Sequence, residues 1–289
     1  MLLSTQTVAT AQAFGYEKSV EIIAKAGFDA VDFSMFTMPD EYFGKENRAA
    51  FTKKMRALAA DAGVSFNQAH APFPSLLCDE NDTKRLELTK TAIVSAAELG
   101  AKVIVVHPAK YLPYESNAEE LFKINMEMYG SLLPLAKELG IKIGVENMYT
   151  LNRETNVISD APCSRPEEFC RYIDTLDSPY VTACLDTGHA PLVGQTPEDM
   201  IRKLGRRIGA LHVNDNDLKS DLHTIPYTAK IDFDAVTDAL AEIGYSGEIT
   251  LEADGFLYPL PHELIPDALG FMARVGRHLI ARIEQKSVI

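Results

Sequence analysis

The amino-acid sequence predicts an α/β protein built as a closed (β/α)8 barrel, the TIM-barrel architecture, with a single domain over residues 1–289. Short apolar runs rich in β-branched residues alternate with longer amphipathic stretches along the whole chain. This alternation indicates a parallel sheet covered by helices. Eight such units occur, at about 36 residues a unit, which fits a barrel. No G-x-G-x-x-G motif follows the first run, so an open doubly wound sheet is the less favoured alternative.

Each predicted strand is short and mostly apolar. The strands are expected over residues 1–9, 28–35, 64–71, 101–108, 141–147, 180–189, 208–215 and 247–254. The intervening stretches place apolar residues three and four positions apart, as at Val20, Ile23 and Ala24, so one face of each helix can be buried. The helices are expected over residues 17–27, 47–63, 82–100, 117–140, 165–176, 196–205, 231–244 and 261–283. Several end in glycine, which readily forms a left-handed C-cap: Gly27, Gly63, Gly100, Gly140 and Gly244.

The composition is that of a globular protein with a strongly acidic surface. Hydrophobic residues make up 46% of the chain, charged residues 24%, and the formal net charge is −13. A surface of this sign repels phosphate backbones, which argues against nucleic acid or an anionic membrane as a partner. No segment reaches the ~20 apolar residues of a membrane span, and no secretory signal is visible. The four cysteines form no C-x-x-C pair, which favours free thiols and a cytoplasmic location.

Titratable side chains recur at the carboxyl ends of the predicted strands, where TIM barrels carry their chemistry. They follow strands three to eight, and the loop after strand seven adds two more. The set is His70, His107, Glu146, Asp186, His189, His212, Asp221, His223 and Glu252. Five of the seven histidines of the chain belong to this set. Histidines scattered over a surface would not gather at one end of the barrel in this way.

Four of these residues lie on four consecutive predicted strands and are interpreted as ligands of one divalent metal ion: Glu146, Asp186, His212 and Glu252. An unpaired carboxylate directly after an apolar strand would be costly. Several carboxylates at one barrel mouth would also repel one another unless a cation lies between them. A mixed set of imidazole and carboxylate ligands suits Zn²⁺, Mn²⁺, Fe²⁺ or Co²⁺ better than Ca²⁺.

The neighbours of these residues are open to more than one interpretation. His70 and His107, taken alone, fit hydrogen-bonded structural histidines as well as ligands. Asn147 and Asn214 are expected to hold ligands in place or to cap the following helix. Gly188 is expected to let the backbone turn so that the next residue, a histidine, also faces the mouth.

The segments "VEN", "CLDTGH", "HVND", "SDLH" and "LEAD" resemble those of the xylose-isomerase-like TIM-barrel superfamily over essentially the whole chain. That superfamily includes sugar-phosphate isomerases and epimerases, ketose 3-epimerases, inosose-handling enzymes and the endonuclease IV type of DNA-repair enzyme. For the isomerase branch, the resemblance implies one divalent metal ion (Mn, Zn, Co or Mg) held by Glu146, Asp186, His212 and Glu252. It also implies that Glu146 and Glu252 are the catalytic acid/base pair and that His189 contacts the substrate.

The endonuclease branch is the alternative, because its trinuclear zinc site uses more ligands. The residues that match these further ligands, and that could otherwise bind substrate, are His70, His107, His189, Asp221 and His223. The acidic charge, the absence of Trp and the separation of Lys110, Arg153 and Lys219 in the sequence favour the isomerase branch.

The expected activity is therefore isomerisation or epimerisation of a ketose or related α-hydroxy carbonyl compound through a cis-enediolate. The alternatives are a zinc-dependent apurinic endonuclease and an inosose-type dehydratase. The expected partner is a small-molecule sugar, with no nucleic acid and no membrane, and the resemblance implies a possible homo-oligomer. No clear phosphate-binding loop follows the last strand at residues 254–256, which favours an unphosphorylated ligand.

Overall fold

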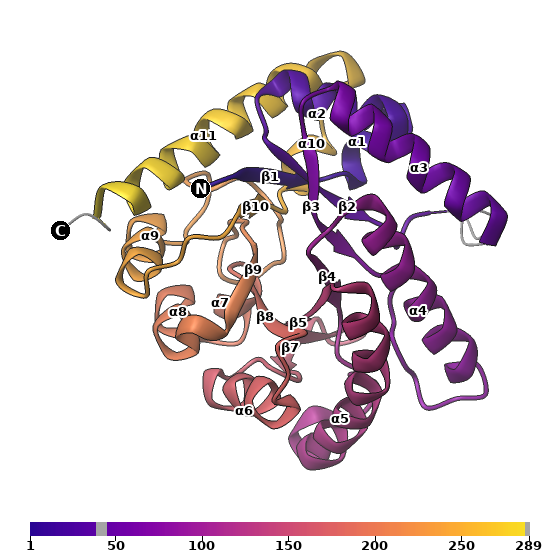
Figure 1. The fold of residues 1–289 in the computed structure, drawn as a ribbon. Helices are drawn as coiled ribbons and strands as arrows, with labels where there is room; N and C mark the ends of the chain where they lie inside the picture. The colour runs from indigo at the N-terminus through magenta and orange to yellow at the C-terminus, as the bar shows by residue number, and fades with distance from the viewer. Residues whose placement is uncertain (39–44, 287–289) are drawn as a thin grey trace.

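The computed structural model describes residues 1–38 and 45–286 and confirms the TIM barrel as a single domain (Figure 1). Eight parallel strands form the ring, in the order β10-β1-β2-β3-β4-β5-β8-β9. They are β1 (Leu3–Gln6), β2 (Ala30–Ser34), β3 (Ser65–His70), β4 (Val103–Val106), β5 (Lys142–Glu146), β8 (Val181–Asp186), β9 (Ile208–His212) and β10 (Ile249–Leu251). A separate antiparallel hairpin consists of β6 (Tyr149–Asn152) and β7 (Val157–Asp160).

Backbone hydrogen bonds just beyond β9 close the ring. The amide of Val213 donates to the carbonyl of Thr250 at 2.8 Å, and the amide of Glu252 donates back to the carbonyl of Val213 at 3.1 Å. These two bonds join β9 to β10, the two ends of the strand order, so the last strand lies beside both its sequence neighbour and the first strand.

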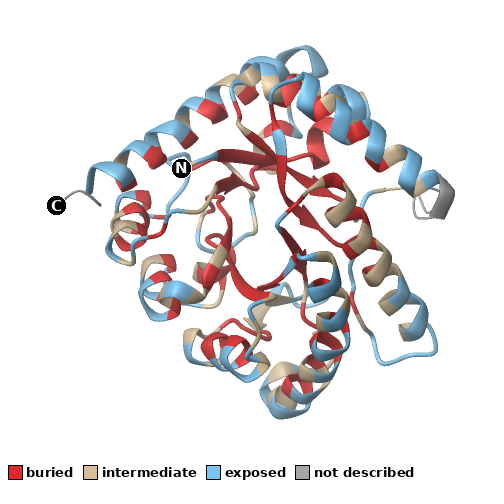
Figure 2. Ribbon diagram, viewed as in Figure 1, coloured by how far each residue is buried: buried red, intermediate tan, exposed pale blue. Residues whose placement is uncertain are grey.

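The helices lie outside the ring, each packed over the strands next to it (Figure 1). The longer ones are α2 (Tyr16–Ala26), α3 (Lys45–Asp61), α4 (Asp82–Leu99), α5 (Tyr114–Leu139), α6 (Pro166–Leu176), α8 (Pro197–Leu204), α9 (Phe233–Glu242) and α11 (Ile265–Lys286). Short helices α1 (Val8–Phe14), α7 (His189–Leu192) and α10 (Asp254–Leu257) follow β1, β8 and β10. Figure 2 shows buried strands and helices that are buried on the side facing them. None of the helices in the described ranges has the length and apolar character needed to cross a membrane.

The eight predicted strand–helix units are all present, and the five predicted glycine caps all have positive φ. The first strand is much shorter than expected, because residues 8–14 form α1 instead of continuing it. Periodicity cannot separate a short apolar strand from a short buried helix, which explains this error. The hairpin over residues 149–160 was not predicted, since its residues lie between two expected elements in what reads as a loop.

A small apolar cluster inside the barrel lies directly below the candidate site. It consists of Val103, Val105, Cys184 and Ala210, separate from the main core between sheet and helices. Side chains alternate along a strand with a period of two, so the residue two positions later points to the same face. The next inward positions after Val105, Cys184 and Ala210 are therefore His107, Asp186 and His212. In this way the same pattern that packs the interior also directs polar side chains into the mouth.

Candidate active site

Four strands bring the predicted metal ligands together at the carboxyl end of the barrel. Glu146, Asp186 and His212 end β5, β8 and β9, and Glu252 directly follows β10. One potential ligand atom from each lies within 4.8 Å of every other. All four side chains are buried, and Asp186 and His212 are fully so. The four residues, which are 106 positions apart at the extremes, thus share one small volume.

The contacts within this cluster fit a cation. Nδ1 of His212 lies 3.0 Å from Oε1 of Glu146 and 2.6 Å from Oε2 of Glu252. One ring nitrogen carries at most one proton, so it cannot hydrogen-bond well to both carboxylates. Oε2 of Glu146 and Oε2 of Glu252 are also buried and make no well-directed hydrogen bond, although each lies within 3 Å of a histidine nitrogen. Two carboxylates and an imidazole that converge with unsatisfied oxygens form a suitable donor set for a divalent metal ion.

The carboxyl group of Asp186 shows how crowded with negative charge the cluster is. Burial raises the pKa of Asp186, and the nearby carboxylates of Glu252 and Glu146 raise it further, to about 6, despite the opposing charge of His189. A carboxyl group in this position resists ionisation because its charge would be desolvated and close to like charges. A cation within the cluster would offset both effects.

Two asparagines support Asp186. The side-chain amide of Asn214 donates to Oδ2 of Asp186 at 2.9 Å, while Asn147 exchanges two hydrogen bonds with the Asp186 backbone. Both therefore act by holding the acid in place, one of the two roles expected from the sequence. Gly188 was expected to provide a backbone turn that needs glycine. This reason was wrong, because its φ of −79° is open to any residue. A Cβ on Gly188 would lie 1.9 Å from Oδ1 of Asn214, so the glycine provides room for that side chain.

Asp32 is a further residue of the site that the sequence did not single out. It is fully buried on β2, and its Oδ2 lies 3.4 Å from Nε2 of His212. A carboxylate on the far nitrogen fixes the ring orientation of a metal-ligating histidine and increases its basicity. Asp32 also accepts a 2.9 Å hydrogen bond from Gln68. An acid inside the apolar run "AVDFS" was the available signal.

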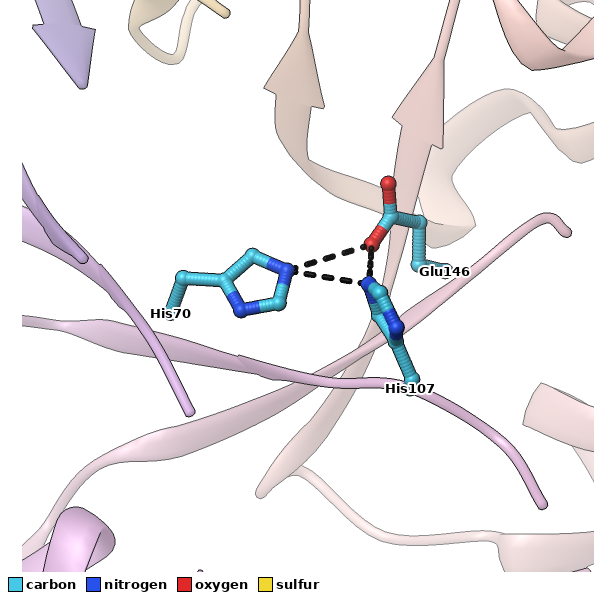
Figure 3. Close-up of side chains that lie close together, drawn as sticks. All are labelled: His70, His107 and Glu146. Carbon is cyan, nitrogen blue, oxygen red and sulfur yellow. Dashed lines mark hydrogen bonds and ion pairs between the residues drawn. The ribbon is translucent and has the colours of Figure 1, made fainter. Parts of the chain in front are cut away.

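A second group of ligand-type atoms consists of His70, His107 and Glu146 (Figure 3). The two Nε2 atoms are 3.0 Å apart, and Oε2 of Glu146 lies 2.9 Å from that of His107. Nδ1 of His70 contacts the carbonyl of Ala71 at 2.8 Å, and a carbonyl only accepts, so Nδ1 carries the proton. This leaves Nε2 of His70 directed at the other two side chains. Burial lowers the pKa of His107 to about 4, so its ring is neutral at neutral pH.

A third group consists of His189, Asp221 and His223. Nδ1 of His189 bonds the carbonyl of Asn147 at 2.8 Å, and Nδ1 of His223 bonds that of Glu252 at 3.1 Å. In both rings this leaves Nε2 toward Asp221, at 3.9 Å and 3.1 Å respectively. All nine residues singled out in the sequence thus lie in three adjoining groups. Two of the groups share Glu146, and Nδ1 of His189 in the third lies 3.6 Å from Oε1 of Glu146.

Seven of these nine residues, all except Asp186 and His212, line one cavity of about 580 Å³ at the barrel mouth. The cavity wall also includes Lys110 and Arg153, so the fold brings to one cavity two cations that are separated in the sequence. Lys110 donates a 2.6 Å hydrogen bond to the carbonyl of Tyr149, and the Tyr149 hydroxyl donates to Asp221 at 2.8 Å. Apolar side chains complete the wall: Phe36, Phe73, Met148, Leu151, Leu222 and Tyr258.

The fold and the site together define a TIM barrel that carries a candidate metal centre at the carboxyl ends of its strands. A family model described as xylose isomerase-like TIM barrel matches residues 20–275, and the chain belongs to this family.

The similarity to individual proteins is lower. The chain is 30% identical over 191 residues to the protein MJ1311 of Methanocaldococcus jannaschii, spanning 63% of this chain and 62% of that protein. It is 23% identical over 287 residues to D-psicose 3-epimerase of Enterocloster bolteae, spanning 94% and 85%. It is 26% identical over 200 residues to an inosose dehydratase of Lacticaseibacillus casei, spanning 60% and 65%. The solved structure of a D-tagatose 3-epimerase-like protein has a TM-score of 0.72 at 25% identity, covering 95% of this chain and 98% of that one.

Proposed function

We propose that this protein is a divalent-metal-dependent isomerase or epimerase that acts on a ketose or a related α-hydroxy carbonyl sugar. One observation carries the proposal: the buried carboxylates of Glu146 and Glu252 lie at 3.0 Å and 2.6 Å from the same nitrogen of His212. Two candidate bases therefore lie against the same potential metal ligand, and both line the same cavity. The relatives that are named as sugar epimerases support the same class of reaction.

The proposed ligands of the metal ion are Glu146, Asp186, His212 and Glu252, whose donor types and unsatisfied oxygens fit such an ion. When bound, the ion would supply Lewis-acid stabilisation for the negative charge that develops on the substrate oxygens.

The two glutamates are proposed to move the substrate proton. One carboxylate removes the proton next to the carbonyl group, which gives a cis-enediolate. The other returns a proton to the opposite face of the same carbon, which gives the epimer. Alternatively it protonates the former carbonyl carbon while the remaining hydroxyl proton passes to the former carbonyl oxygen, which gives the isomer. Burial raises the pKa of Glu252, but the charge of His212 outweighs burial and lowers it to about 2. His212 loses that charge when it binds a metal ion, and the charge of the ion would then keep the carboxylate ionised at neutral pH, as a base must be.

The remaining polar groups of the cavity are proposed to position the substrate. Nε2 of His189 faces the cavity, because its Nδ1 is held by the carbonyl of Asn147. It can form a hydrogen bond with a substrate oxygen. Phe36 and Tyr258 on the wall would exclude water from the enediolate, since a drier site strengthens electrostatic contacts.

The test is incorporation of solvent deuterium into candidate sugars. Purified protein is supplied with Mn²⁺, Co²⁺ or Zn²⁺ in D2O and incubated with a panel of ketoses, aldoses and inosose-like ketones. Deuterium at the carbon next to the carbonyl, together with a product epimer or isomer, supports the proposal. If every sugar returns unlabelled under all metals, the proposal is wrong.

A zinc-dependent phosphodiesterase of the apurinic endonuclease type is the second candidate. The specific observation in its favour is the presence of the two further ligand-type groups, with His70 and His107 in one and His189, Asp221 and His223 in the other. The net charge of −13 argues against it, since DNA binding draws on basic surface. Nicking of an abasic duplex, with about three zinc ions bound per chain, would support this candidate over the isomerase.

A dehydratase of an inosose-type ketone is the third candidate, favoured by the similarity to an inosose dehydratase. It shares the first proton transfer but loses a hydroxyl group afterwards. Mass analysis of the products separates the two, because dehydration lowers the mass by one water and isomerisation leaves it unchanged.

A further inference from the structure

A second cavity adjoins the candidate active site. It has a volume of about 230 Å³ and is formed by the loop between β3 and α4 and the loop between β4 and α5. It shares Phe73, His107 and Lys110 with the larger cavity, so these three side chains border both cavities. The rings of Phe73 and His107 stack there, with centroids 4.6 Å apart and planes inclined by 23°.

The lining of this second cavity differs in chemistry from that of the first. Beyond the shared residues, it consists mainly of apolar and aromatic side chains: Pro74, Leu76, Leu77, Pro108 and Tyr111. It contains no carboxylate and, apart from the shared histidine, no metal-ligand type among the described residues. Phe73 and Leu77 are 47% and 39% exposed. Apolar surface that stays exposed beside a polar site commonly marks a ligand contact.

One polar group in the second cavity lacks a partner. Ser75 lines it and is only 3% exposed, and its Oγ makes no hydrogen bond. A buried hydroxyl without a partner costs free energy, which a ligand with a hydrogen-bonding group could recover. The larger cavity, at about 580 Å³, is already of the size that encloses a drug-sized ligand, for which roughly 300–1,000 Å³ is typical.

We propose that the second cavity is a subsite for an apolar or aromatic substituent, so that the substrate is a sugar joined to such a group and not a free monosaccharide. The sugar ring lies among the carboxylates and histidines of the larger cavity, and its substituent passes Phe73 to reach Leu76, Leu77 and Ser75. This inference rests on the proposed function for the identity of the sugar-binding cavity. It adds the class of substrate.

The test measures binding, so that it does not depend on turnover. Affinities of the metal-supplemented protein for 1-O-benzyl-D-fructose and for 1-O-methyl-D-fructose, which both keep the carbonyl group of a ketose, are compared by calorimetry. We expect the benzyl ether to bind about tenfold more tightly, the order of magnitude for burying one aromatic ring. The substitution Leu77→Trp, which fills the cavity from its exposed rim, should bring the ratio of the two affinities close to one.

Two further variants keep the result interpretable. Leu264→Trp is the matched control, because Leu264 is 49% exposed and lines neither cavity, so the ratio should stay as in the wild type. Phe73→Ala removes the shared aromatic wall and should also lower the ratio. Thermal unfolding of each variant checks that it is folded.

Equal affinities for the two ethers, or no measurable binding of the benzyl ether, overturn the subsite. A preference that Leu77→Trp and Phe73→Ala both leave intact overturns it as well. Neither result touches the proposed function, which is tested separately by the incorporation of solvent deuterium.

Discussion

The side-chain amide of Asn214 donates a 2.9 Å hydrogen bond to Oδ2 of Asp186, from a strand-end loop 28 residues further along the chain. The other carboxylate oxygen, Oδ1, accepts the backbone amide of His189 at 2.7 Å. Both oxygens of Asp186 are therefore oriented by the protein before any ligand arrives. Asn214 can approach this closely because residue 188 is a glycine.

The substitution Gly188→Ala should disrupt this arrangement. The new Cβ would lie 1.9 Å from Oδ1 of Asn214, so Asn214 must move away from Asp186. Loss of such supporting hydrogen bonds typically weakens metal binding or activity by about 10–100-fold. The measurements are metal affinity by competition with a chelating dye and the initial rate on the labelled sugar.

Gly130→Ala is the control for that substitution. Gly130 lies within α5, and a Cβ there meets no heavy atom within 4 Å. Alanine should stabilise this helix by about 0.5–1 kcal/mol and leave metal affinity unchanged. Equal metal affinity in the Gly188→Ala protein and the wild type would contradict the role given to Asn214.

Replacing either catalytic candidate, as Glu146→Gln or Glu252→Gln, should lower the rate by about 10²–10⁴-fold or more, because an amide cannot accept the substrate proton. The exposed Glu138 on α5 offers a matched control in Glu138→Gln, which should keep full activity. Rates are followed by deuterium incorporation, and circular dichroism verifies the fold. Near wild-type turnover in either active-site variant would rule out the two-glutamate scheme.

Removal of divalent ions should silence the enzyme and lower its stability. Dialysis against a chelator takes away the charge that the carboxylates of Glu146, Asp186 and Glu252 would share. Returning an ion to about 100 times its dissociation constant should then stabilise the fold by about 2.7 kcal/mol. Differential scanning calorimetry measures this shift, and elemental analysis counts the ions. An unchanged melting temperature and rate after complete chelation would contradict the metal centre.

Asp29 provides a prediction about pH that is independent of the active site. Its carboxylate accepts hydrogen bonds of 2.6 Å and 2.7 Å from Arg277 on α11 and one of 2.8 Å from the amide of Leu3. The hydrogen bond to Arg277 lowers the pKa of Asp29, against the opposing effect of burial. A lowered pKa in the folded state contributes stability above the unfolded value, near 4, and that stability is lost as the pH falls.

Asp29→Asn should therefore be less stable than the wild type at pH 7, by about 0.5–1 kcal/mol, since solvent screens this part-exposed pair. Below pH about 3 the difference should shrink, because the wild-type carboxyl group is then also neutral. Urea unfolding at several pH values measures it. Asp61→Asn is the control, since Asp61 is exposed and forms no ion pair within the described ranges. A stability difference between Asp29→Asn and the wild type that stays constant with pH would contradict the lowered pKa of Asp29.

Much of the barrel was predictable because its units repeat. The spacing of apolar residues in each amphipathic stretch indicates which face of the helix is buried, and a glycine cap such as Gly100 indicates where the helix ends. The two elements that were not predicted lack such a signal. Residues 8–14 form α1 although they continue an apolar run, and residues 149–160 form a hairpin whose strands are partly exposed. Short elements are held by tertiary contacts more than by their own periodicity.

The candidate site was predictable in part for a related reason. Glu146 and Asp186 each end an apolar strand, so their charge conflicts with the pattern around them and draws attention. Asp32 conflicts in the same way, but it lies within its strand and its neighbour His212 is 180 residues away. Lys110 and Arg153 are ordinary in sequence, and only the fold of two loops and a hairpin brings them to the same cavity.

The sequence by itself determined which residues face the barrel mouth, because strand alternation and strand ends are local properties written in consecutive residues. Tertiary structure alone decided which atoms meet. It brings two glutamates to one nitrogen of His212, and it packs Asn214 where a side chain on residue 188 would lie. It also forms an apolar cavity beside His107. Such contacts depend on barrel closure, which sets distances of a few ångströms between segments that no local pattern relates.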